Sequence, residues 1–148
     1  MRRLTNWGVV LLVTFSAACS GEPVGPPPPP FVIAISVAVH SAALNSESGE
    51  YECRYTFTAR ATGGTTGTYA NWQSGEGQWR YPAGGSSTFF LDNLDLVDYF
   101  GSNRISTGAT QTAPRIASYS GEFDLSYTFR ASMPDSTLSS TSVFVDCY

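Results

Sequence analysis

The sequence has no lysine and a single histidine, His40, and these two shortages limit the chemistry that the chain can perform. Without lysine there is no amine nucleophile and no Schiff-base site. A Ser-His-Asp triad would have to be built on His40, and a zinc site would lack a second histidine. His40 lies at the end of a strand-like pattern, where we expect an exposed or edge residue. The sequence therefore predicts a protein that is not an enzyme and holds no metal or other cofactor.

Positive charge is also scarce. If Arg2 and Arg3 are lost with the N-terminal segment discussed below, six arginines remain against twelve acidic residues, a net charge of −6. Nucleic-acid binding needs clustered positive charge that displaces counterions from phosphates. The sequence therefore predicts no nucleic-acid partner. The six remaining arginines are spread singly along the chain: Arg54, Arg60, Arg80, Arg104, Arg115 and Arg130.

The first 18 residues have the pattern of a secretory signal peptide. Arg2 and Arg3 give a positive start, residues 7–15 are an apolar run too short to span a membrane, and residues 16–18 are small. Cys19 and Ser20 follow. This junction resembles the lipobox of bacterial lipoproteins, although Ser16 occupies a position where an aliphatic residue is usual. Ordinary cleavage after residue 18 is the alternative interpretation.

The resemblance to lipoproteins implies that Cys19 is lipidated and becomes the acylated N-terminus. More than one acyl chain on that residue would anchor the protein stably to a membrane. Ser20 in place of aspartate favours the outer membrane of the cell envelope, facing either the periplasm or the surface. Assigning Cys19 to lipid leaves two of the three cysteines as a pair in an oxidising compartment. Residues 19–30, which end in five prolines, form a tether, and the prolines alone extend about 15 Å.

Residues 31–148 are enough for one domain, and a strand over residues 51–61 is its clearest element. Every second residue of this segment is apolar, so Cys53 points inward. Cys147 falls on the apolar face of residues 143–147. A Cys53–Cys147 disulfide would tie an early strand to the last one.

The remaining segments predict an all-β domain. Residues 68–82 are interpreted as two short strands joined by a glycine-rich turn at 74–77. Residues 92–101 have a helical period, with Asp92 as N-cap, Asp95 in the first turn and Gly101 as the stop. A calcium site on Asp92, Asp95 and Asp98 is the alternative, but the sequence lacks a calcium-loop motif, so capping is favoured. Further strands are expected at residues 31–40, 88–91, 104–107, 113–119, 121–131 and 138–147.

The order of Cys53, Trp72 and Cys147 resembles the immunoglobulin-type sandwich, in which a tryptophan packs against the inter-sheet disulfide. The resemblance implies an immunoglobulin-like antiparallel β-sandwich of about seven to eight strands with one short helical crossover. Cys147 lies on the last strand instead of the penultimate one. The strand order therefore stays open.

The whole layout resembles small bacterial lipoproteins with immunoglobulin-like domains. It implies a membrane-anchored envelope protein with a module for protein interaction or a structural role, whose partner is an envelope or extracellular protein. The alternative is a carbohydrate-binding module in which surface aromatic residues stack on sugar rings. Core packing competes with that interpretation, more strongly for the first tryptophan than for the second. The candidate glycan-binding residues are Tyr69, Trp72, Trp79 and Tyr81.

Overall fold

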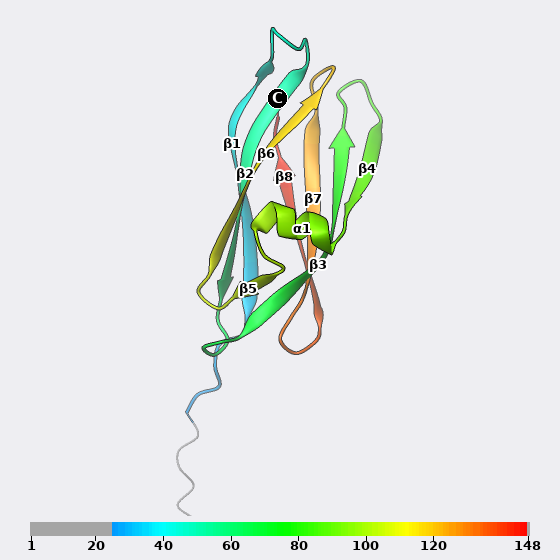
Figure 1. The fold of residues 1–148 in the computed structure, drawn as a ribbon. Helices are drawn as coiled ribbons and strands as arrows, with labels where there is room; N and C mark the ends of the chain where they lie inside the picture. Colours follow the sequence, from blue (N-terminus) through cyan, green and yellow to red (C-terminus); the bar gives the residue numbers. More distant parts are fainter. Residues whose placement is uncertain (1–24, 148) are drawn as a thin grey trace, which may run out of the picture.

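A computed structural model describes residues 25–147 and has two antiparallel β-sheets packed face to face (Figure 1). The three-stranded sheet has the order β1-β2-β6, formed by β1 (Val32–Leu44), β2 (Tyr51–Thr62) and β6 (Thr110–Tyr119). The five-stranded sheet has the order β4-β3-β7-β8, and β5 also pairs with β3. Its strands are β3 (Tyr69–Arg80), β4 (Ser86–Leu91), β5 (Arg104–Ser106), β7 (Asp124–Ser132) and β8 (Leu138–Val145).

This arrangement confirms the predicted all-β sandwich and resolves its strand order. In constant-type immunoglobulin sandwiches the first, second, fourth and fifth strands share one sheet, and the third, sixth and seventh share the other. Variable-type domains add strands after the third to the second sheet. The three-stranded sheet of this domain has no strand in the fourth place among the described residues. Here β1, β2 and β6 take the first set of places, whereas β3, β7 and β8 take the second with β4 added at the edge. The fold is therefore immunoglobulin-like, although the cysteine positions are not those of antibody domains.

The strand β2 follows its alternating sequence closely. Cys53, Tyr55 and Phe57 are almost completely buried, whereas Arg54 is exposed. The inward side chains of β2 meet those of β7, and the ring of Phe57 lies edge-on to the ring of Phe129 with centroids 5.2 Å apart. Aromatic pairs of this geometry join the two sheets and form the centre of the core.

The strand β3 differs from the prediction. Residues 69–80 form one continuous strand, and the predicted turn at 74–77 is wrong. Gly77 lies opposite Phe89 of β4 on the inner side of the sheet, and a Cβ atom at Gly77 would lie 2.0 Å from the Phe89 Cζ. Glycine in a strand often marks such a close approach. Gly77 thus makes room for the aromatic ring of Phe89.

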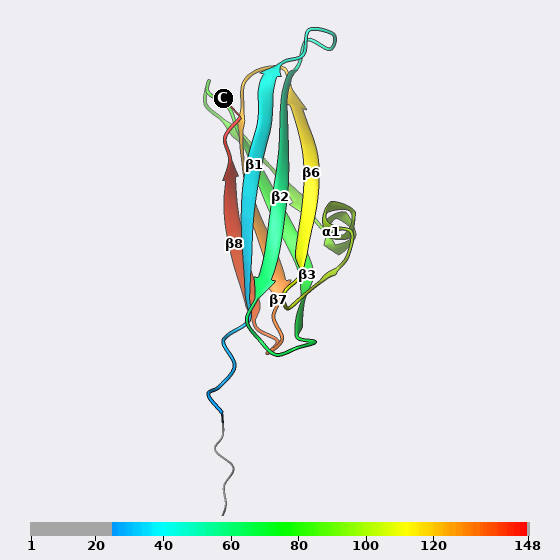
Figure 2. The ribbon, with the colours of Figure 1, turned by 90° about the vertical axis from the view of Figure 1, so that its left-hand side faces the viewer.

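The predicted helix is present as α1 (Asn93–Phe100). The Asp92 carboxylate accepts the N–H groups of residues 94 and 95, while the Asp95 carboxylate accepts the Asp92 N–H at 2.8 Å, which is a reciprocal capping box. Gly101 follows the last helical residue and donates its N–H to Val97. Capping is thus confirmed for the two aspartates. The helix lies beside the open edge of the sandwich between β6 and β3 (Figures 1 and 2).

The N-terminal segment joins the domain at one end of the sandwich (Figure 1). The Gly64 N–H donates to the Pro29 carbonyl oxygen at 2.8 Å, and residues 28–30 line a depression together with Met133 and Thr137. The end of the predicted tether is therefore held against the domain. The predicted signal peptide at 1–18 and Cys19 lie outside the described residues. Within residues 25–147, no helix is long and apolar enough to cross a membrane.

Candidate functional site

The two ends of the sandwich differ in what they carry (Figure 2). The proximal end receives the N-terminal segment and has the loops at residues 63–68 and 133–137. The opposite end, here called the distal end, has the loops at residues 45–50, 81–85 and 120–123 and the C-terminal residues 146–147. The strands run from one end to the other, so side chains at the proximal end are separated from side chains at the distal end by the length of the sandwich.

The predicted disulfide is present near the distal end. Cys53 of β2 bonds to Cys147, which follows β8, with Cα atoms 5.7 Å apart and both residues fully buried. The backbone N–H of Cys147 donates to the buried Asp124 Oδ1 at 3.2 Å. The bridge and this hydrogen bond fix the C-terminal segment across the two sheets.

An aromatic cluster closes the distal end beside the disulfide. The ring of Tyr81 stacks on the ring of Tyr119 with centroids 4.6 Å apart, and Trp79 lies 4.8 Å from Phe123 and 6.2 Å from Tyr119. Tyr119 belongs to the three-stranded sheet, so these contacts join the two sheets. A shallow depression of about 440 Å³ lies at this surface, lined by Tyr81, Tyr119, Glu122 and the residues of both adjoining loops.

This distal cluster contains two of the four predicted glycan-binding residues. Trp79 is half-buried beside Tyr119, and Tyr119 is 39% exposed. Sequence reasoning missed Tyr119 and Phe123 as parts of the cluster. The alternation of β6 could have identified Tyr119, because it shares the phase of the buried residues Ala113 and Ala117.

The other two predicted residues lie elsewhere. Trp72 is 1% exposed, its ring stacks on Phe100 at 4.8 Å, and its Nε1 donates to Gln111 at 3.0 Å. Trp72 is a core residue, so its interpretation as a stacking surface is wrong. Tyr69 is exposed at the proximal end, where the Arg104 guanidinium lies 4.6 Å from its ring centroid. Trp79 follows Tyr69 by ten positions along the same strand, about 33 Å, so the four residues do not form one platform.

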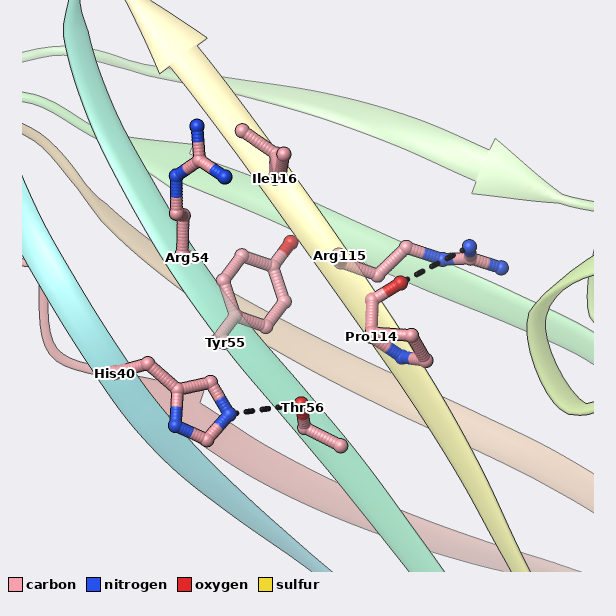
Figure 3. Close-up of a pocket in the computed structure, with 7 residues that line it drawn as sticks. All are labelled: His40, Arg54, Tyr55, Thr56, Pro114, Arg115 and Ile116. Atoms are coloured by element: carbon pink, nitrogen blue, oxygen red, sulfur yellow. Dashed lines mark hydrogen bonds between the residues drawn. The ribbon is translucent and has the colours of Figure 1, made fainter. Parts of the chain in front are cut away.

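His40 lies on the outer face of the three-stranded sheet at an irregularity in the pairing of β1 with β2 (Figure 3). Its Nε2 is 2.9 Å from the Thr56 hydroxyl, and the residue is exposed as predicted. Arg54, Pro114 and Ile116 complete a shallow depression there. In the part of the chain that the structure describes, no three histidine, cysteine or acidic side chains gather closely enough to hold a metal ion.

Two tyrosine hydroxyls meet in the middle of the core. The hydroxyl oxygens of Tyr55 on β2 and Tyr127 on β7 are 2.7 Å apart, and both residues are at most 3% exposed. Burial raises the pKa of Tyr55 from 10.0 to about 12. Burial also raises the pKa of Tyr127, and the neighbouring Tyr55 contributes to that increase. One hydroxyl donates to the other, so this hydrogen bond joins β2 of one sheet to β7 of the other.

This pair predicts a loss of stability at alkaline pH. A folded-state pKa above the unfolded value gives a contribution that is complete below about pH 10 and is lost as the pH rises through about 12. The urea midpoint of the protein should therefore fall steeply over this range. The fall should be shallower in the Tyr55→Phe/Tyr127→Phe variant and unchanged in Tyr69→Phe, which alters an exposed tyrosine. Equal slopes in all three proteins would contradict the assignment.

Comparison with known proteins supports the fold. No family profile matches the chain, and no curated protein matches it by sequence. Among solved structures, the chain is similar to the putative ApaA protein from Bordetella pertussis, with a TM-score of 0.60 and 12% identity over 81% of this chain and 97% of that one. A second structural-genomics target has a TM-score of 0.60 and 12% identity over 77% of this chain and 85% of its own. At this level of identity the similarity shows a shared fold alone.

Proposed function

We propose that the protein is a lipid-anchored protein of the cell envelope whose sandwich presents its distal end to a protein partner. One observation carries the proposal: the N-terminal segment and the distal aromatic cluster lie at opposite ends of the domain (Figure 1). The strand β1 has 13 residues, so the domain holds the distal end about 40 Å beyond the tether. A lipid on Cys19 would thus place the membrane at the far end from Tyr81 and Tyr119.

The chemistry of the distal end favours a protein partner with basic residues. Tyrosine is enriched at protein interfaces because it combines a large apolar ring with a hydroxyl group. The distal loops carry three exposed acidic residues, Glu47, Glu50 and Glu122. One basic residue, Arg80, lies at the distal end of β3. Acidic side chains around an aromatic centre attract a complementary positive surface and increase the rate of association.

The anchor is tested by measuring the intact mass of the protein extracted from membranes. We expect a chain that begins at Cys19, carries acyl chains, and gains two alkyl groups only after reduction and alkylation. The Cys19→Ala variant should appear in the soluble fraction. A wild-type mass that begins at residue 19 without lipid would show a freely secreted domain and would overturn the anchoring part of the proposal.

The partner is tested by site-specific cross-linking in intact cells. A photoreactive phenylalanine analogue replaces Tyr81 at the distal end or Tyr69 at the proximal end as a matched control. We expect one dominant protein adduct from position 81, weakened by high salt, and none from position 69. Adducts of equal yield from both positions, or none from either, would contradict a distal protein interface.

Glycan binding is the second candidate, favoured by the stacked and partly exposed rings of Tyr81 and Tyr119. A glycan array distinguishes it from protein binding. Signals that disappear in Tyr81→Ala, persist in Tyr69→Ala and change little with salt would favour stacking on a sugar. The absence of any array signal together with a protein adduct would favour the first function.

A further inference from the structure

Arg115 occupies an unusual place for an arginine. It lies on β6 between Ala113 and Ala117, on the side of the strand that faces the core, and its side chain is only 22% exposed. The two buried alanines leave space on either side of it. Figure 3 shows its side chain extending from β6 away from His40. This arginine therefore enters the open edge of the sandwich, between β6 and α1.

The guanidinium group of Arg115 has partners for only some of its donors. Its Cζ lies 3.7 Å from the centroid of the Tyr99 ring on α1, and its Nη1 donates to the Pro114 carbonyl oxygen at 3.2 Å. Its Nε and Nη2 are buried and have no hydrogen-bond partner among the described residues. The Asp98 Oδ2 is 3.6 Å from Nη2, beyond hydrogen-bond distance, and the Asp98 side chain is 86% exposed.

The identity of these two atoms is informative. Nε and Nη2 form one edge of the guanidinium fork, and this edge can donate two parallel hydrogen bonds to a single carboxylate. Buried donors without acceptors are costly in a folded protein, and each calls for a physical explanation. A carboxylate supplied by a ligand would satisfy both donors of Arg115.

Aromatic side chains surround the space next to Arg115. A cavity of about 280 Å³ lies between β6 and the five-stranded sheet, and it is as open to solvent as the shallow distal depression. Its volume is close to the lower end of small-molecule sites. Rings in such walls can contact another ring by stacking or edge-on packing. The aromatic residues that line the cavity are Tyr55, Trp79, Phe89, Tyr99 and Tyr127.

We propose that this cavity binds a small monocarboxylate that carries a ring. Nε and Nη2 of Arg115 are covered in this structure, so the ligand carboxylate would have to displace the side chains that cover them in order to accept from both. The ring of the ligand would pack against the aromatic residues that line the cavity. A single negative charge fits best, because the nearby Asp98 carboxylate repels a dianion. The ligand carboxylate would compete with the Asp98 carboxylate for the positive charge of Arg115. The cavity adjoins the distal aromatic cluster through Trp79, which belongs to both, but the proposal does not depend on the proposed function.

Benzoate is the probe, and Trp79 provides the signal because it lines the cavity. Titration of the full-length protein should give a saturable change in tryptophan fluorescence and a matching heat in calorimetry. Benzamide, which has the same ring without the charge, should bind at least about tenfold more weakly. Equal binding of benzoate and benzamide would overturn the proposed role of the carboxylate.

Three variants locate the site. Arg115→Gln should weaken benzoate binding about tenfold or more, whereas Asp98→Asn should strengthen it by removing the competing carboxylate. Arg104→Gln is the matched control, because Arg104 also lies over a tyrosine ring but at the proximal end. If Arg115→Gln fails to fold, Asp98→Asn still tests the proposal. No saturable binding to the wild type, or binding unchanged in both Arg115→Gln and Asp98→Asn, would overturn it.

Discussion

Replacing both Cys53 and Cys147 with alanine is expected to lower the free energy of unfolding by about 4 to 5 kcal/mol in the chain-entropy model of disulfides. The bridge joins residues 94 positions apart, so its removal releases nearly the whole domain in the unfolded state. This loss is a large share of the free energy of unfolding of a typical domain, which is about 5 to 15 kcal/mol. Urea denaturation followed by tryptophan fluorescence measures it.

Reduction provides the control for this double variant. The wild-type protein in excess dithiothreitol should unfold at the same urea concentration as the oxidised double variant, because both lack the same constraint. A wild-type midpoint that does not change on reduction would show that the bridge contributes nothing to stability. The double variant is preferable to Cys53→Ala alone, which leaves Cys147 as a buried free thiol.

The second large effect is expected at Gly77. An alanine there places its Cβ against the Phe89 ring, and Gly77→Ala should lower the free energy of unfolding by about 1 to 3 kcal/mol, as overpacked cores do. Gly121→Ala is the matched control, because a Cβ at Gly121 has no atom within 4 Å. The control should differ little from the wild type in its urea midpoint.

A rescue experiment tests whether the destabilisation by Gly77→Ala comes from the Phe89 ring. Phe89→Leu replaces the ring with a smaller side chain, so Gly77→Ala should cost less in the Phe89→Leu background than in the wild type. The difference between the two costs is the coupling energy of a double-mutant cycle. If Gly77→Ala costs the same in both backgrounds, Phe89 does not account for the glycine.

Elements specified by local patterns were predicted well. The alternation of β2 and the aspartate cap of α1 lie within a few residues of sequence, and both appear as expected. The error at β3 arose because the neighbour that requires Gly77 is Phe89, on the next strand. From the sequence alone, a group of glycines is interpreted as a turn, because the ring that requires Gly77 belongs to another strand. Local patterning thus predicted the sandwich but not this contact.

The candidate sites depended still more on distant partners. Trp79 and Tyr81 were predicted to work with Tyr69 and Trp72, their neighbours in sequence, whereas the structure places them beside Tyr119 of the other sheet. In the sequence, Arg115 is only one of six arginines spread singly along the chain. Its position between the buried residues Ala113 and Ala117 indicates that it lies on the core-facing side of β6. The ring that it stacks on could not be predicted from β6, because Tyr99 belongs to α1.

The placement of β1 also determines how the domain would respond to mechanical force. The tether leads directly into the first residue of β1, which pairs with β2 from Val32 to Leu44. The inter-strand hydrogen bonds of an antiparallel pair run perpendicular to the strands. A pull between the tether and a partner at the distal end would therefore shear the β1–β2 ladder as a whole instead of opening it one pair at a time. Beyond that ladder, the Cys53–Cys147 bond would limit how far the rest of the chain can extend.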